Sequence, residues 1–139
     1  MAAVLTVAAG AIHLAQVGSH FAQDWTFGLF FLVVGGIQVV GGVLLLARRR
    51  SLWFWLGIAG SGAVIAVWVV SRSVGLPFGP ELSHTEEIGS ADAAASLLEA
   101  LTIVLLALWL RARWRARDVA GCLTACCELP AAGRLLIDR

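Results

Sequence analysis

The sequence predicts an all-α protein, a four-helix transmembrane bundle of up-down-up-down order with both termini in the cytoplasm. Three observations predict it. Hydrophobic residues make up 60% of the 139 residues and charged residues only 14%, whereas a soluble domain carries about 25% charged residues. Four apolar segments each approach the roughly 20 residues that cross a bilayer. The arginines gather in two groups, one between the second and third segments and one after the fourth.

One transmembrane domain is expected over residues 1–117, with spans at about 2–19, 26–47, 52–72 and 93–112. The first span has no basic residue before its apolar run, so we expect it to be retained rather than cleaved as a signal peptide. Residues 118–139 would form a cytoplasmic tail whose thiols are reduced. The role of its three cysteines stays open: Cys122, Cys126 and Cys127.

The arginine groups set the orientation of the spans. The first consists of Arg48, Arg49 and Arg50, and the second of Arg111, Arg113, Arg115 and Arg117. Arginine-rich loops stay in the cytoplasm, so the loops at 20–25 and 73–92 should face the outside. We expect a multi-pass protein of a bacterial plasma membrane, in contact with the lipid bilayer. Because the arginines follow the membrane boundaries, no nucleic-acid partner is expected.

The first span carries a polar stripe. Thr6, His13 and His20 are seven residues apart, with Gln16 between the two histidines. This spacing places them on one face of a helix. The stripe would continue into Gln23 and Asp24 if the helix extends that far.

The second span repeats the seven-residue spacing with small residues. Gly28, Gly35 and Gly42 form this stripe, and glycine stripes let membrane helices approach closely. The stripe should therefore pack inside the bundle and carry Gln38 with it. The third span offers a similar contact surface, made by Gly57, Gly60, Ser61 and Gly62. Such glycine-rich faces are also the expected surface for a membrane-protein partner or for a second copy of the chain.

The fourth span has one polar side, made by Asp92, Ser96, Glu99 and Thr102. At 1.5 Å per residue, Glu99 lies about 9 Å below the outer end of its span, and His13 lies at about the same depth below the outer end of the first. Ionisable groups in lipid turn inward and find partners. We therefore expect His13 and Glu99 to meet.

The outer half of the bundle holds two sets of candidate site residues. A polar pocket with apolar walls, the usual form of a small-molecule site, would use His13, Gln16, Gln38, Glu99 and Arg72. Arg72 ends the third span, and its expected partner is Asp24 or Glu81. A transition-metal site would use a second set, because imidazole and carboxylate groups bind such ions. This set consists of His20, Asp24, Glu81, His84 and Glu87.

The spacing limits the cofactor predictions. His13 and His20 are about 10 Å apart along a helix, too far to share one ion, and no H-E-x-x-H motif is present. Copper or zinc is the expected metal, and haem fits less well because both buried histidines lie on one span. The alternative is purely structural: the His13–Glu99 and Arg72 pairs satisfy buried groups and fix helix register.

Two segments carry a family resemblance. An H-x6-H-F segment corresponds to His13, His20 and Phe21, and an S-R-x-V-G-L-P-x-G-P-E segment corresponds to residues 71–81. Over most of residues 8–105 the chain resembles a group of small, uncharacterised four-span bacterial membrane proteins. In size and span number it is also similar to DoxX-like proteins. The resemblance implies the four-span fold and no particular activity.

The sequence leaves three functions open. The first is a small membrane protein that binds a transition metal or another small ligand at an outward-facing site of histidines and carboxylates. The second is an accessory or assembly subunit of a larger membrane complex. The third is a small oxidoreductase for a quinone-like or lipid substrate, so whether the protein is an enzyme also stays open.

Overall fold

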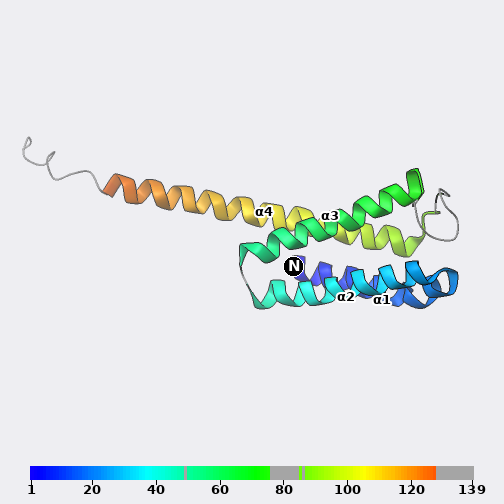
Figure 1. Cartoon of the computed structure of the whole chain (residues 1–139). Coiled ribbons are helices and arrows are strands. Elements are labelled where there is room, and N and C mark those ends of the chain that lie inside the picture. Colours follow the sequence, from blue (N-terminus) through cyan, green and yellow to red (C-terminus); the bar gives the residue numbers. More distant parts are fainter. Residues whose placement is uncertain (49, 76–84, 86, 128–139) are drawn as a thin grey trace, which may run out of the picture. The chain divides into compact units, whose positions relative to one another are not determined.

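The described part of the chain consists of four α-helices and contains no strand. The computed structural model describes residues 1–48, 50–75, 85 and 87–127, and within residues 121–127 only the side chain of Cys122. The helices are α1 (Ala2–Gln23), α2 (Trp25–Ala47), α3 (Ser51–Ser73) and α4 (Ser90–Cys127) (Figure 1). All four are long and apolar enough to cross a membrane. The chain is therefore a multi-pass membrane protein, and the predicted all-α, four-helix class is confirmed.

The chain divides into two compact units, Met1–Ala107 and Leu108–Arg139. The first unit holds α1, α2, α3 and the beginning of α4, and it contains every contact of the candidate site described below. The α4 helix runs to Cys127, whereas the predicted span ends at about residue 112. Arginine and alanine are strong helix formers, so the helix continues beyond the point at which the hydropathy falls.

The second unit contains a stacked pair of side chains. The Arg113 guanidinium carbon lies 5.0 Å from the ring centre of Trp109, one helical turn earlier. Cys122 is exposed and carries a free thiol. The side chains of the other two cysteines, Cys126 and Cys127, lie outside the described residues.

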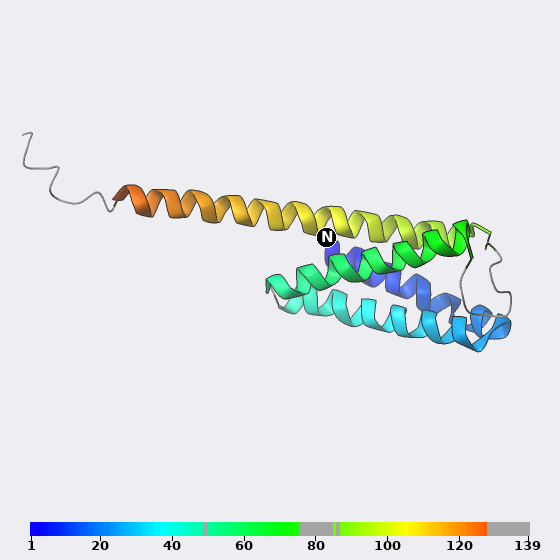
Figure 2. The same ribbon diagram turned by 45° about the horizontal axis from the view of Figure 1, so that its top comes forward.

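The α1 and α2 helices form the closest helix pair and lie side by side in both views (Figures 1 and 2). All three glycines of the α2 stripe are buried. A Cβ atom added to Gly35 would lie 2.9 Å from the Gly10 carbonyl oxygen, and one added to Gly42 would lie 2.9 Å from the Ala3 carbonyl oxygen. Only glycine lets the two backbones approach this closely, so the prediction that the stripe packs inside the bundle is confirmed.

The α3 helix packs more loosely against α2. A Cβ atom added to Gly57 would lie 2.8 Å from Leu106 of α4, whereas one added to Gly60 or Gly62 would have no neighbour within 4 Å. Within this chain the predicted glycine contact is therefore right for Gly57 and wrong for Gly60 and Gly62. The physical reason is that a small residue permits close approach without requiring it.

Exposure follows the pattern of a helix bundle in lipid. Many large apolar side chains of the first unit are exposed, among them Leu29, Ile37, Val40, Leu46 and Leu97. Buried positions hold mainly small or polar residues instead, including Ala3, Thr6, Ala9, Ser61 and Ala95. Lipid tails are as apolar as leucine, so packing of small residues and interhelical hydrogen bonds hold such a bundle together.

Asp24 is the single residue that connects α1 and α2. Its backbone is extended (φ −158°, ψ 140°), and its N–H group donates to the His20 carbonyl oxygen at 2.9 Å. Its carboxylate accepts hydrogen bonds from the Thr26 backbone N–H at 2.7 Å and from the Thr26 hydroxyl, as a helix N-cap does. The bond from the Thr26 hydroxyl, followed by the backbone bond, lowers the pKa of Asp24 below its usual value.

Replacing Asp24 by alanine is expected to lower the thermal unfolding midpoint in detergent, because α2 loses its cap. The lowered pKa sets the pH window. The charged cap is fully stabilising above the unfolded pKa of about 3.9, and this stabilisation is lost as the pH falls through the folded pKa. Asp24→Asn keeps a capping oxygen without the charge. The thermal unfolding midpoint of this variant should therefore not fall as the pH drops through the folded pKa of Asp24. Equal acid dependence of the wild type and Asp24→Asn would contradict this assignment.

The end of α3 places Arg72 in the last helical turn. The N–H groups of Val74 and Gly75 both donate to the Val70 carbonyl oxygen, at 3.0 and 3.1 Å. Gly75 has φ 77°, in the left-handed region that glycine adopts at helix C-termini.

Candidate functional site

Three helices bring polar side chains together inside the first unit. Glu99 of α4 is 1% exposed and accepts a hydrogen bond from the side-chain amide of Gln38 on α2, which is 8% exposed. His13 of α1 is 6% exposed, and its Nε2 lies 3.7 Å from Glu99 Oε1. The predicted meeting of His13 and Glu99 is confirmed, and Gln38 completes what we call the His13–Gln38–Glu99 cluster.

The cluster retains unused hydrogen-bonding capacity. Both ring nitrogens of His13, Oε1 of Gln38 and the hydroxyl of nearby Thr102 are buried without a hydrogen-bond partner among the described residues. Buried polar atoms are normally paired, and each unpaired one costs about 1–3 kcal/mol. The cluster therefore holds more donors and acceptors than its own members satisfy.

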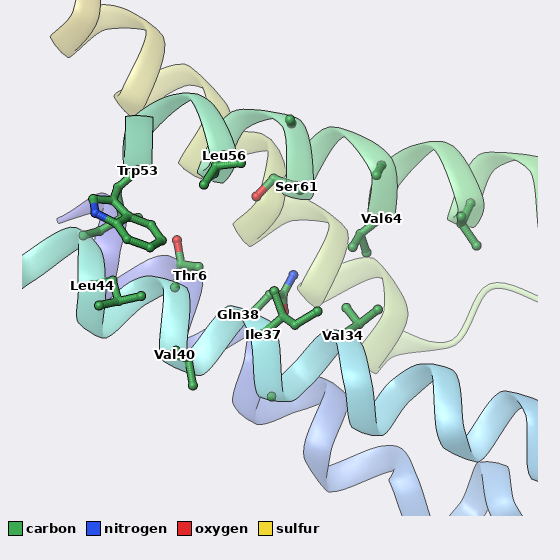
Figure 3. A pocket seen from close by; sticks show the side chains of 18 of the residues that line it. Thr6, Val34, Ile37, Gln38, Val40, Leu44, Trp53, Leu56, Ser61 and Val64 are labelled. Carbon is green, nitrogen blue, oxygen red and sulfur yellow. The ribbon is translucent and has the colours of Figure 1, made fainter. Parts of the chain in front are cut away.

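A cavity of about 700 Å³ lies between α2 and α3 beside the cluster. Gln38 belongs to its lining, and the other polar side chains there are Thr6 and Ser61 (Figure 3). The rest of the wall is apolar and includes Val34, Ile37, Leu44, Trp53, Leu56 and Val64. Small-molecule sites have this size and form, apolar walls with a few placed polar groups.

A second cavity of about 310 Å³ lies at the end of the helices where α1 passes into α2 at Asp24, and residues of all four helices line it. We call this end the Asp24 end. It is more polar, with His13, His20 and Arg72 among its lining residues. The side chains of Phe30, Val64 and Val67 line both cavities. The two cavities are therefore neighbours that share a wall.

Arg72 is fixed by α4 rather than by the predicted partners. Its guanidinium donates to Asp92 Oδ2 at 2.5 Å and to the Ser71 hydroxyl at 2.6 Å. The prediction of Asp24 as its partner is wrong, because the Asp24 carboxylate caps α2. The other predicted partner, Glu81, lies outside the described residues.

The predicted metal ligands do not form a group in the described part of the chain. His20 Nδ1 lies 3.1 Å from Gln23 Oε1, and the imidazole stacks on Phe31 with ring centres 3.8 Å apart. Glu87 is exposed, and Asp24 is engaged as the cap. Nowhere among the described side chains of residues 1–48, 50–75, 85, 87–120 and 122 do three histidine, cysteine or acidic groups gather so that they could hold a metal ion. Two further predicted ligands lie outside those ranges, Glu81 and His84.

Gln16 does not belong to the polar pocket in which the sequence predicts it. Its side-chain oxygen accepts a hydrogen bond from the Ser19 hydroxyl at 3.2 Å, and it lines neither cavity. Two residues that the sequence reasoning missed do line the second cavity, Phe31 and Trp68. Trp68 could have been found, since it lies four residues before Arg72, one helical turn away.

Fold and site together define a polytopic helical membrane protein with a buried polar cluster beside an apolar cavity. Comparison of the chain with protein-family models, with curated proteins and with solved structures finds no match.

Proposed function

We propose that this protein binds a small lipid-soluble molecule in the cavity between α2 and α3. The observation that carries the proposal is the position of Gln38, which lines the cavity and also donates to the buried Glu99. Polar side chains inside a membrane face the bundle interior or a cavity and are candidates for a functional site. The cavity volume of about 700 Å³ falls within the roughly 300–1,000 Å³ of small-molecule sites.

The apolar wall determines the class of ligand. Long hydrocarbon surfaces from α2 and α3 suit an acyl or isoprenoid chain or a comparable apolar body. The polar side chains in this wall, with Gln38 foremost, can hydrogen-bond one or two ligand atoms. The proposal is therefore a binding protein for a quinone-like or lipid molecule. It takes the binding role from the first function that the sequence leaves open and the class of ligand from the third.

Two matched glycine variants test the proposal. Gly60 lines the cavity and Gly62 does not, and neither has a neighbour within 4 Å of an added Cβ atom. Gly60→Leu should therefore fill part of the cavity without disturbing the backbone, while Gly62→Leu adds the same side chain to the same helix elsewhere.

The measurement is native mass spectrometry of protein purified from its membrane in mild detergent. The wild type and Gly62→Leu are expected to retain a non-covalently bound small molecule, and Gly60→Leu to lose most of it. Equal retention by all three proteins, or no bound molecule in the wild type, would contradict the proposal.

A further inference from the structure

We infer that the cavity at the Asp24 end receives the head of the ligand, an uncharged planar ring that carries carbonyl oxygens. This inference rests on the proposed function and names the class of ligand. The two cavities are adjacent, because Phe30, Val64 and Val67 line both of them. We therefore place the tail of the ligand between α2 and α3 and its head past these three side chains, in the second cavity.

The lining of the second cavity favours a flat ring. Phe27, Phe30, Phe31 and Trp68 all contribute to it, together with the imidazole of His20. The His20 ring is stacked on Phe31 with an interplanar angle of 22°. Aromatic side chains bind flat rings by offset stacking and edge contacts, whereas a glycerol head group offers no flat face.

The charges in this cavity favour an uncharged head. Arg72 is already neutralised by Asp92 at 2.5 Å, and the exposed Glu87 also lines the cavity. A further anion would be repelled by these two carboxylates. Among the lining residues a cation would find only the exposed carboxylate of Glu87, whose charge water screens, because Asp92 is already paired with Arg72.

The free donors in this cavity favour a head that accepts hydrogen bonds. The indole N–H of Trp68 and the Nε–H of Arg72 are buried without an acceptor among the described residues. The Arg72 guanidinium lies 5.6 Å from the Trp68 ring centre, so the two donors belong to one stacked unit. A carbonyl oxygen of the ligand would supply the acceptor that these two buried donors lack.

The test uses radiolabelled decyl trimethylbenzoquinone, a fully substituted ring that does not add to thiols, and the decyl trimethylbenzene of matched size without carbonyl oxygens. Binding is measured to the full chain in nanodiscs and corrected for nanodiscs without protein. Trp68→Phe removes the N–H donor and keeps the ring. Trp25→Phe is the matched control, because Trp25 is 66% exposed and lines neither cavity.

We expect the quinone to bind the wild type more tightly than the hydrocarbon, and Trp68→Phe to weaken quinone binding about tenfold, as the loss of one hydrogen bond would. Trp25→Phe should bind the quinone as the wild type does, and Trp68→Phe should leave hydrocarbon binding unchanged. A loss of hydrocarbon binding in Trp68→Phe would mean that Trp68 only shapes the cavity, and would overturn the inference.

Other outcomes separate this inference from the proposed function. If both probes bind equally well, and Gly60→Leu weakens both, the head assignment fails while the cavity proposal stands. Tighter binding of dioleoylglycerol than of the quinone would likewise overturn the planar head. If neither probe exceeds the nanodisc background, and native mass spectrometry finds no bound molecule, the proposed function fails with it.

Discussion

Glu99→Ala is expected to lower the free energy of unfolding by about 2 kcal/mol. One interhelical hydrogen bond in a membrane protein contributes about 0.6 kcal/mol on average, so loss of the bond from Gln38 alone would not reach this value. The larger part arises because the Gln38 amide loses its acceptor in the buried interior, at about 1–3 kcal/mol for an unpaired buried group. The His13 imidazole also loses the carboxylate that lies 3.7 Å from its Nε2. Equilibrium unfolding in mixed micelles with a denaturing detergent measures the change.

Two controls separate this effect from general weakening of α4. Glu99→Gln keeps an acceptor oxygen on a side chain of the same length, so its stability should stay within about 0.6 kcal/mol of the wild type, the average interhelical bond. Leu97→Ala truncates a residue on the same helix that is 60% exposed, and it should have little effect. If Glu99→Ala proves as stable as Leu97→Ala, the cluster does not hold α4 in place.

Gly35→Ala is expected to destabilise the protein by about 1–3 kcal/mol, the range for inserting a methyl group into a filled contact. The added Cβ would lie 2.9 Å from the Gly10 carbonyl oxygen and 2.8 Å from Leu14 Cγ. A backbone oxygen cannot rotate away, so α1 and α2 must separate. Because Gln38 lies one turn further along α2, the separation should also displace its amide from Glu99. Gly35→Ala should therefore bind the quinone more weakly in addition to being less stable.

The neighbouring residue provides the control. An added Cβ at Gly36 has no neighbour within 4 Å, and alanine is a better helix former than glycine. Gly36→Ala should therefore be at least as stable as the wild type in the same unfolding measurement. Equal effects of the two substitutions would mean that the α1–α2 contact is not close at Gly35.

The fold could be predicted from the sequence because lipid imposes a simple rule. Backbone polar groups inside a bilayer must be paired within the segment, so a long apolar run becomes a helix. Helix ends follow other rules. The α1 helix ends at Gln23, four residues beyond the predicted end at 19, with Asp24 as its cap, and α4 continues through a charged stretch to Cys127. Hydropathy indicates where a helix leaves the lipid, and capping and helix propensity determine where it ends.

The site could be predicted only in part. The meeting of His13 and Glu99 could be predicted because both lie at the same depth in the membrane, and depth follows from counting residues along each helix. Which helices are neighbours, and how each is rotated, does not follow from such a count. For that reason Arg72 was assigned to Asp24 or Glu81 when it pairs with Asp92, and the Gln38–Glu99 bond could not be foreseen.

Solid-state NMR in lipid bilayers can measure whether His13, Gln38 and Glu99 meet within the membrane. Protein labelled with ¹⁵N in histidine and glutamine side chains and with ¹³C in glutamate carboxyl groups would be measured for nitrogen–carbon dipolar contacts. His13→Asn and Gln38→Leu would assign the two signals. We predict a strong contact from the Gln38 amide nitrogen to the Glu99 carboxyl carbon and a weaker one from His13. A Glu99 carboxyl without contact to either nitrogen would contradict the cluster and the function built on it.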